Sequence, residues 1–433
     1  MPAFGVLSSM EVLDNILDYV NRNKRILQLL LGIAIAIFIG LTELKAQSTE
    51  GFIYGKVFTR DTEYIGQLRW GNEEAYWHEH FNASKVSNEH SRALDRYRDR
   101  NKDKDSWRNM DWRISSIWED KAKTVHQFGC QFGDIQQIKN YGGSRVVIML
   151  KNGEEMELSG SGYNDIGTKV KVLDQELGEI TIDWDRIDKI EFMPTPKNLS
   201  RTFGDPVYGT VKTYRNGDIE GYVVWDHDER LGTDKLDGDA RDGDVSIHFD
   251  KIKSIRRDRD GSDVELLSGR RFYLTGSNDV NNSNRGIIVH VDGVGEVDIP
   301  WREFDAVEFK KPKSSGMAYS NYTTPRGLRG KVMKYRGGEV SGDIVFDLDE
   351  SMEIEILEGK DNQIEYKIPF RNIKSIAPRN YNFSTVKMRN GKEILLGDGR
   401  DVSDNNAGLF VYEKGSSDPV YIEWRDVTEV IFD

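Results

Sequence analysis

Apolar and polar residues alternate along most of the chain after residue 50. Typical runs are Val264-x-Leu266, Val386-x-Met388 and Ile344-x-Phe346. A period of two places the apolar side chains on one face of a β-strand, whereas a helix needs a period near 3.6. Asn-Gly and Ser-Gly pairs between such runs are typical of tight hairpins, because glycine accepts a positive φ. The pattern therefore predicts an all-β protein of short strands.

Three stretches of the chain carry the same landmarks in the same order. Each opens with an apolar-x-Gly-x-Val motif, which begins at Ile53, Val207 and Leu328. A second glycine follows, and then an alternating run that ends in an aromatic residue before an acidic cluster. These aromatic residues are Trp70, Trp225 and Phe346. Self-similarity over so many landmarks predicts three tandem modules.

Each module also closes both of its halves with an apolar-x-aromatic-x-x-apolar-x-x-apolar motif. The second halves carry it at 182–190, 299–307 and 422–430. The spacing predicts a strand, one tight helical turn and another strand. One half is too small to bury a sufficient core, so we expect the halves to pack together as two barrels or as one sandwich. Their shared core is predicted to contain Trp184, Trp301 and Trp424.

This order of strands and turns resembles the small-barrel plan of Src-homology-3-like, Sm-like and PRC-barrel folds. The resemblance rests on the glycines and the closing motif, and it spans residues 53–432. It implies small β-barrels but identifies no functional family, since a fold alone does not fix a function.

Proline-rich stretches separate the predicted modules. Residues 193–206 and 310–327 contain five of the ten prolines, and we interpret both stretches as linkers. The β modules are then predicted over residues 53–192, 207–309 and 328–432.

Residues 75–124 interrupt the first module where the other two have a short loop. This insertion holds 11 basic and 9 acidic residues, a net charge of +2 (11 − 9), and its part from Ser87 to Asp105 is predicted to be an exposed charged helix. Long insertions often bind partners. The candidate partner-binding residues are Trp77, Trp107, Trp112 and Trp118. Alternatively, Trp77, Trp112 and Trp118 cap the first barrel.

The first 46 residues are typical of an export signal. Leu29–Leu41 is a run of apolar and glycine residues that follows Lys24 and Arg25, and Ala46 offers a small residue for cleavage. As a helix this run would span about 20 Å, which is short of the ~30 Å hydrocarbon core of a membrane. We expect a cleaved signal and a periplasmic or extracellular protein. The alternative is an uncleaved inner-membrane anchor that leaves Gln47 onward outside the cytoplasm.

The charge balance and the cysteine content exclude several classes of protein. The chain has 60 Lys and Arg against 73 Asp and Glu, a formal net charge of −13, which argues against general nucleic-acid binding. Cys130 is the only cysteine. Neither an intramolecular disulfide nor a zinc site of several thiolates can form, and we expect Cys130 to be buried as a small hydrophobic residue.

Carboxylates cluster directly after the aromatic residue of the second and third modules. The candidate calcium ligands are Asp226, Asp228, Glu229, Asp347, Asp349 and Glu350. Clustered oxygens suit calcium, but no EF-hand spacing is present, and the alternative is a polar hairpin end in which Asp bonds nearby backbone. A further Asp recurs in each module and is predicted to form a turn. These residues are Asp165, Asp279 and Asp401.

Motifs for other chemistry are weak or absent. His78-Glu79-His80 could begin a metal site, but the sequence shows no third ligand for it. The chain contains no serine-hydrolase elbow, phosphate-binding loop, His-Glu-x-x-His motif or dinucleotide fingerprint. We therefore predict no catalytic residue and no cofactor, and calcium is the one candidate ion.

The sequence predicts a non-enzymatic, exported protein of the bacterial envelope that binds or scaffolds a protein or a cell-surface glycan. Two alternatives stay open. One is a sensor or assembly factor anchored in the membrane through Leu29–Leu41. The other is a glycan hydrolase that uses acidic loop residues as acid and base.

Overall fold

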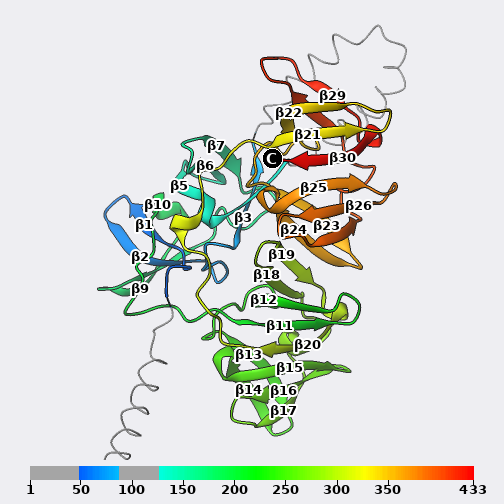
Figure 1. The fold of residues 1–433 in the computed structure, drawn as a ribbon. Helices are drawn as coiled ribbons and strands as arrows, with labels where there is room; N and C mark the ends of the chain where they lie inside the picture. The colour runs from blue at the N-terminus through cyan, green and yellow to red at the C-terminus, as the bar shows by residue number, and fades with distance from the viewer. Residues whose placement is uncertain (1–47, 87–125) are drawn as a thin grey trace, which may run out of the picture. The chain divides into compact units, whose positions relative to one another are not determined.

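A computed structural model describes residues 48–86 and 126–433 of the chain (Figure 1). The predicted signal or anchor and most of the predicted insertion, including Trp107, Trp112 and Trp118, lie outside the described residues. In the described part, all helical elements are three-residue 3-10 turns, and the strands β1–β30 form three antiparallel sheets. The protein is all-β, as the period of two predicts. None of the described helices is long and apolar enough to cross a membrane.

The first segment, residues 54–192, forms a ten-stranded sheet. Its strands are β1 (Tyr54–Thr59), β2 (Glu63–Trp70), β3 (His80–Lys85), β4 (His126–Gln131), β5 (Ile135–Asn140), β6 (Arg145–Leu150), β7 (Glu155–Ser159), β8 (Val170–Asp174), β9 (Gly178–Ile182) and β10 (Ile187–Phe192). The sheet order is β4-β3-β7-β6-β5-β10-β1-β2-β8-β9. Hairpin β3–β4 thus pairs with β7, and hairpin β8–β9 pairs with β2. The two halves of the segment therefore exchange hairpins and form a single sheet.

The second segment spans residues 208–309. Its strands are β11 (Tyr208–Thr213), β12 (Asp218–Trp225), β13 (Lys235–Ala240), β14 (Gly243–His248), β15 (Ile252–Asp258), β16 (Gly261–Leu266), β17 (Arg271–Leu274), β18 (Ile287–Val291), β19 (Gly295–Ile299) and β20 (Phe304–Phe309). Its first strand pairs with β12 and β20, and β12 pairs with β18. Hairpin β13–β14 is a separate two-stranded sheet.

The third segment spans residues 329–432. Its strands are β21 (Arg329–Lys334), β22 (Glu339–Val345), β23 (Ile356–Asp361), β24 (Ile364–Pro369), β25 (Ile373–Pro378), β26 (Phe383–Met388), β27 (Glu393–Gly397), β28 (Leu409–Tyr412), β29 (Val420–Ile422) and β30 (Val427–Phe432). In all three segments the last strand pairs with both the first and the fifth. Strand β19 also pairs with β24, so the second and third segments share one 18-stranded sheet.

A 3-10 turn precedes the last strand of each half, where the closing motif predicts a tight helical turn. These turns are η1 (Phe132–Asp134), η2 (Trp184–Arg186), η3 (Phe249–Lys251), η5 (Trp301–Glu303), η7 (Phe370–Asn372) and η8 (Trp424–Asp426), and the remaining two are η4 (Asn278–Val280) and η6 (Tyr319–Asn321). The tryptophan that opens the second-half turn is buried in each segment.

These tryptophans pack against aromatic residues from the first half of the same segment. The ring of Trp184 lies 5.8 Å from that of Trp70, measured between centroids. The corresponding distances are 5.9 Å for Trp301 and Trp225 and 5.6 Å for Trp424 and Phe346. The two halves therefore share one aromatic core.

The first part of the predicted insertion belongs to the sheet. Ala75 and Trp77 are fully buried, and β3 pairs with both β4 and β7. The described hairpin reaches Val86 and resumes at His126, so the additional residues join the ends of β3 and β4. The corresponding strand pair in the third segment, β23–β24, closes with only the two residues Asn362 and Gln363.

The predicted linker at 310–327 packs on the first segment. Its Tyr319 and Tyr322 are buried, and the ring of Tyr319 lies 4.5 Å from that of Trp77. The Nζ atom of Lys151 lies 3.5 Å from the centroid of Tyr319, a cation–π contact. This stretch is thus a structural strap that contributes to the core.

Buried ion pairs connect the three segments. Arg230 of the second segment lies 2.7 Å from Glu79 of the first, and Lys367 of the third lies 3.0 Å from Glu296 of the second. Arg371 of the third segment pairs with Asp134 of the first. Removal of one partner would leave a buried charge without compensation, so the packing of the segments is sensitive to the loss of any of these residues. Residues 48–433 accordingly form one compact unit.

Candidate functional site: a charged pocket between the first and third segments

Each segment gathers three carboxylates whose oxygen atoms lie within 4.8 Å of one another. The clusters are Glu73, Glu74 and Asp165; Asp226, Asp228 and Glu229; and Asp347, Glu350 and Asp401. The structure therefore brings together most of the calcium candidates and adds Asp401, which comes from a loop far along the chain. Asp349 instead forms an ion pair with Lys85 at 3.2 Å.

Tight turns position the second and third clusters. Asp226 and His227 have φ values of 48° and 70°, and Asp347 and Leu348 have values of 46° and 59°. Such paired positive φ angles reverse the chain sharply after a strand. The carboxylate of Asp226 then accepts a hydrogen bond from the backbone N–H of Arg285 at 2.5 Å.

The recurring aspartates tie a loop to a neighbouring hairpin. The carboxylates of Asp165, Asp279 and Asp401 accept hydrogen bonds from the backbone N–H groups of Asn82, Asp237 and Glu358 at 2.6, 2.7 and 2.7 Å. Each acceptor lies on the second half of its segment and each donor on the first. These bonds thus hold the exchanged hairpins in place, a wider role than the predicted local turn.

An arginine accompanies each carboxylate cluster. Arg285 lies 2.7 Å from Asp228, Arg400 pairs with Asp347, and Arg230 lies 3.8 Å from Glu74. Carboxylate oxygens fit a hard cation such as calcium. The guanidinium groups already supply positive charge to the same oxygens, which favours an ion-pair role for the clusters over a calcium site.

The clustered carboxyl groups hold their protons unusually tightly. Burial, and then the charge of Asp228, raises the pKa of Glu229 to about 10. Burial raises the pKa of Asp165 to about 7 and that of Asp279 to about 6. Burial and neighbouring aspartates also raise the pKa of Glu350 and Asp401 well above their usual values. Glu229 therefore carries a proton at neutral pH, and Asp165 is about half protonated there.

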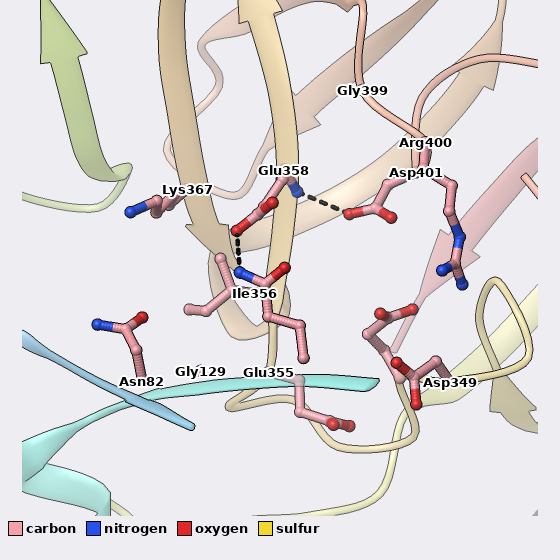
Figure 2. A pocket seen from close by; sticks show the side chains of 12 residues that line it. Asn82, Gly129, Asp349, Glu355, Ile356, Glu358, Lys367, Gly399, Arg400 and Asp401 are labelled. Carbon is pink, nitrogen blue, oxygen red and sulfur yellow. Dashed lines mark hydrogen bonds between the residues drawn. The ribbon is translucent and has the colours of Figure 1, made fainter. Parts of the chain in front are cut away.

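Glu350 and Asp401 of the third cluster line a pocket of about 150 Å³ (Figure 2). Strands β3 and β4 of the first segment contribute Asn82, Gln127 and Gly129. Strands β23 and β24 of the third segment contribute Glu358 and Lys367, and the loop after β27 adds residues 399–401. The amide of Gln127 donates a hydrogen bond to Glu358 Oε1 at 2.8 Å. The pocket therefore has walls from both segments.

Carboxyl groups outnumber basic groups around this pocket, but burial and neighbouring aspartates favour the protonated form of Glu350 and Asp401, which limits its negative charge. Its lining includes five carboxylates, Asp349, Glu350, Glu355, Glu358 and Asp401, against Lys367 and Arg400. Lys85 neutralises part of this charge because it lies 2.5 Å from Glu355 and 3.2 Å from Asp349. Within the described part of the chain, the buried Glu350 Oε2 atom has no hydrogen-bond donor. A cationic group that donates hydrogen bonds fits this lining best.

Trp77 does not form part of an exposed partner surface. It is fully buried, its ring packs on Tyr319, and its indole N–H donates to Thr195 Oγ1 at 3.1 Å. Trp77 therefore packs in the core of the first segment. Cys130 is buried, and burial raises the pKa of its thiol.

Comparisons with known proteins found no matching family model, curated protein or solved structure. The site is therefore interpreted from its own geometry and chemistry.

Proposed function

We propose that this protein is exported to the bacterial envelope and acts there as a non-enzymatic binding or scaffolding protein. In this interpretation the three segments are copies of one duplicated β module. Support comes from the shared sequence landmarks and from the corresponding strand pairings of residues 54–192, 208–309 and 329–432. The apolar run at Leu29–Leu41 and its basic flank support export.

The charged pocket between the first and third segments is the observation that carries this proposal. Its two walls belong to segments that are far apart in the sequence, and the ion pairs of Lys85 and Arg371 fix them relative to each other. A site that is formed before binding loses little conformational entropy when a partner arrives.

The charge of the pocket favours one kind of partner. Carboxyl groups outnumber lysine and arginine in its lining, and their oxygen atoms can accept hydrogen bonds from an ammonium or guanidinium group. Among the two predicted partner classes, a protein that presents a lysine or arginine fits better than a neutral glycan. We propose that such a side chain enters beside Gln127 and Glu358.

A bulky substitution at the edge of the pocket tests this proposal. Gln127 is exposed, so Gln127→Trp blocks the entrance without a large cost in stability, and the exposed strand residue Gln136 offers a matched control as Gln136→Trp. Each protein is used to capture partners from envelope fractions of the producing bacterium. We expect a partner that the unchanged protein and Gln136→Trp both retain and that Gln127→Trp loses.

The opposite pattern contradicts the proposal. If Gln127→Trp melts at the same temperature as the unchanged protein and captures the same partners in the same amounts, the pocket does not bind them.

A further inference from the structure

Three histidine side chains meet where the first segment contacts the second. His78 precedes β3 and His80 begins it, whereas His290 lies on β18 of the second segment. The ring centroids of His78 and His290 are 4.9 Å apart, and those of His80 and His290 are 6.2 Å apart. His80 is 3% exposed and His290 is 8% exposed. The contact thus assembles a buried cluster of imidazoles from two segments.

The nitrogen atoms of this cluster lack ordinary partners. Within residues 48–86 and 126–433, neither ring nitrogen of His78 has a hydrogen-bond partner, and neither does His80 Nε2. Buried polar groups in folded proteins are nearly always satisfied, so such exceptions require an explanation.

A carboxylate lies beside one of the rings, as in many metal sites. Glu296 Oε2 lies 3.2 Å from His80 Nδ1, and Glu296 is itself held by Lys367 at 3.0 Å. The contact is at ion-pair distance and is not a hydrogen bond, because His80 Nδ1 also lacks a hydrogen-bond partner. A turn of the ring that closes this bond would place the proton on Nδ1 and leave the Nε2 lone pair available to a metal. The unpartnered Nε2 atom of His80 is therefore the atom that a metal ion would use.

We propose that His78, His80 and His290 bind a transition-metal ion of the zinc class, with Glu296 as the residue that positions His80. Neutral imidazoles suit zinc and its neighbours. Two imidazoles on one tetrahedral zinc ion, with Zn–N distances of about 2.0–2.1 Å, place their ring centroids about 5 Å apart. The distance of 4.9 Å between His78 and His290 matches this value, whereas His80 and His290 are 6.2 Å apart. The ion would join the first two segments, and His290 would be the third ligand that the His-x-His motif lacks.

The arrangement requires a modest adjustment on binding. Among the described residues, sets of three ligand atoms within 4.8 Å of one another occur only in the carboxylate clusters. At least one histidine ring must therefore turn about its side-chain torsions to complete the site. The nearby cations do not oppose the ion strongly, because Arg230 is paired with Glu79 and Lys367 with Glu296.

Metal titration of the intact protein tests the proposal. The chain is treated with a chelator and then titrated with Zn²⁺ by calorimetry and with Co²⁺ by visible absorption. We expect one equivalent of each ion and the strong absorption of tetrahedral Co²⁺. His80→Gln or His290→Gln should weaken binding at least about 100-fold, and Glu296→Gln should weaken it about 10–100-fold. The exposed His248 provides the control His248→Gln, which should bind normally.

Two results would overturn the proposal. One is the absence of stoichiometric binding to the folded chain. The other is binding that survives His80→Gln but falls in Glu350→Gln, which would assign the ion to the carboxylates. If His290→Gln fails to fold, His78→Gln takes its place, because His78 is the less buried ligand. None of these outcomes depends on the partner proposed for the charged pocket.

Discussion

Substitution of Glu229 by Gln should stabilise the protein at neutral pH. Burial and the neighbouring Asp228 raise the pKa of Glu229 from 4.5 to about 10. Between these two values the unfolded chain releases a proton that the folded chain retains. The stability contributed by a raised carboxyl pKa is thus complete below pH 4.5 and is lost as the pH rises toward 10.

The magnitude follows from the pH interval. At about 2.5 pH units above the pKa of the unfolded chain, that is at pH 7, ionisation of Glu229 in the unfolded state lowers the free energy of unfolding by about 3 kcal/mol relative to pH 4. Glutamine has the shape of a protonated glutamate and does not titrate. Water still reaches part of this side chain, so we expect Glu229→Gln to gain about 1–3 kcal/mol at pH 7 and almost nothing at pH 4.

Urea unfolding at pH 4, 5.5, 7 and 8.5 measures this difference. The exposed Glu176 provides the control Glu176→Gln, which should change stability by less than about 0.5 kcal/mol at every pH. A Glu229→Gln protein that is destabilised equally at pH 4 and pH 7 would refute the reasoning. It would show that the folded protein needs the ionised carboxylate of Glu229.

Four further outcomes follow from the structure. Lys85→Met should lower stability by about 3–5 kcal/mol in denaturant unfolding, because it leaves Asp349 and Glu355 buried without their cation; an unchanged midpoint would mean that the first and third segments separate in solution. Trp77→Ala should cost about 3–5 kcal/mol, since the ring is fully buried, and a loss of partner capture without a loss of stability would instead place Trp77 on a binding surface. The Cys130 thiol should resist labelling by a thiol reagent until the chain is unfolded, because it is buried with a raised pKa; rapid labelling of the native protein would contradict its burial. N-terminal sequencing of the protein from fractionated cells should find a start at Gln47 in a soluble envelope or medium fraction, whereas a start at Met1 or Met10 in membranes would support the anchor.

The strands and turns could be predicted from the sequence because local patterns encode them. The motif Ile422-x-Trp424-x-x-Val427-x-x-Val430 specifies a strand, a buried aromatic residue in a 3-10 turn and a second strand, and the structure has β29, η8 and β30 there. The exchange of hairpins could not be predicted. Alternation shows that β2 pairs with some strand, but the choice of β8 over β3 is a tertiary property.

The candidate site was only partly visible in the sequence. Asp347 and Glu350 are close in the chain and form a recognisable cluster, whereas Lys85 and Lys367 look like ordinary exposed charges on alternating strands. Arg371 lies 237 residues from its partner Asp134. His290 is similarly remote from His78, and only the packing of two segments brings such pairs together.

A photo-crosslinking amino acid at position 127 tests the central claim most directly. The protein carries it in place of Gln127 in living cells, and a second protein carries it at Gln136 as the control. The account predicts that illumination joins position 127, but not position 136, to one envelope component. Excess lysine-rich competitor should suppress the product, because the pocket is acidic. Identical products at both positions, or no product at position 127, would contradict the claim that this pocket binds a partner.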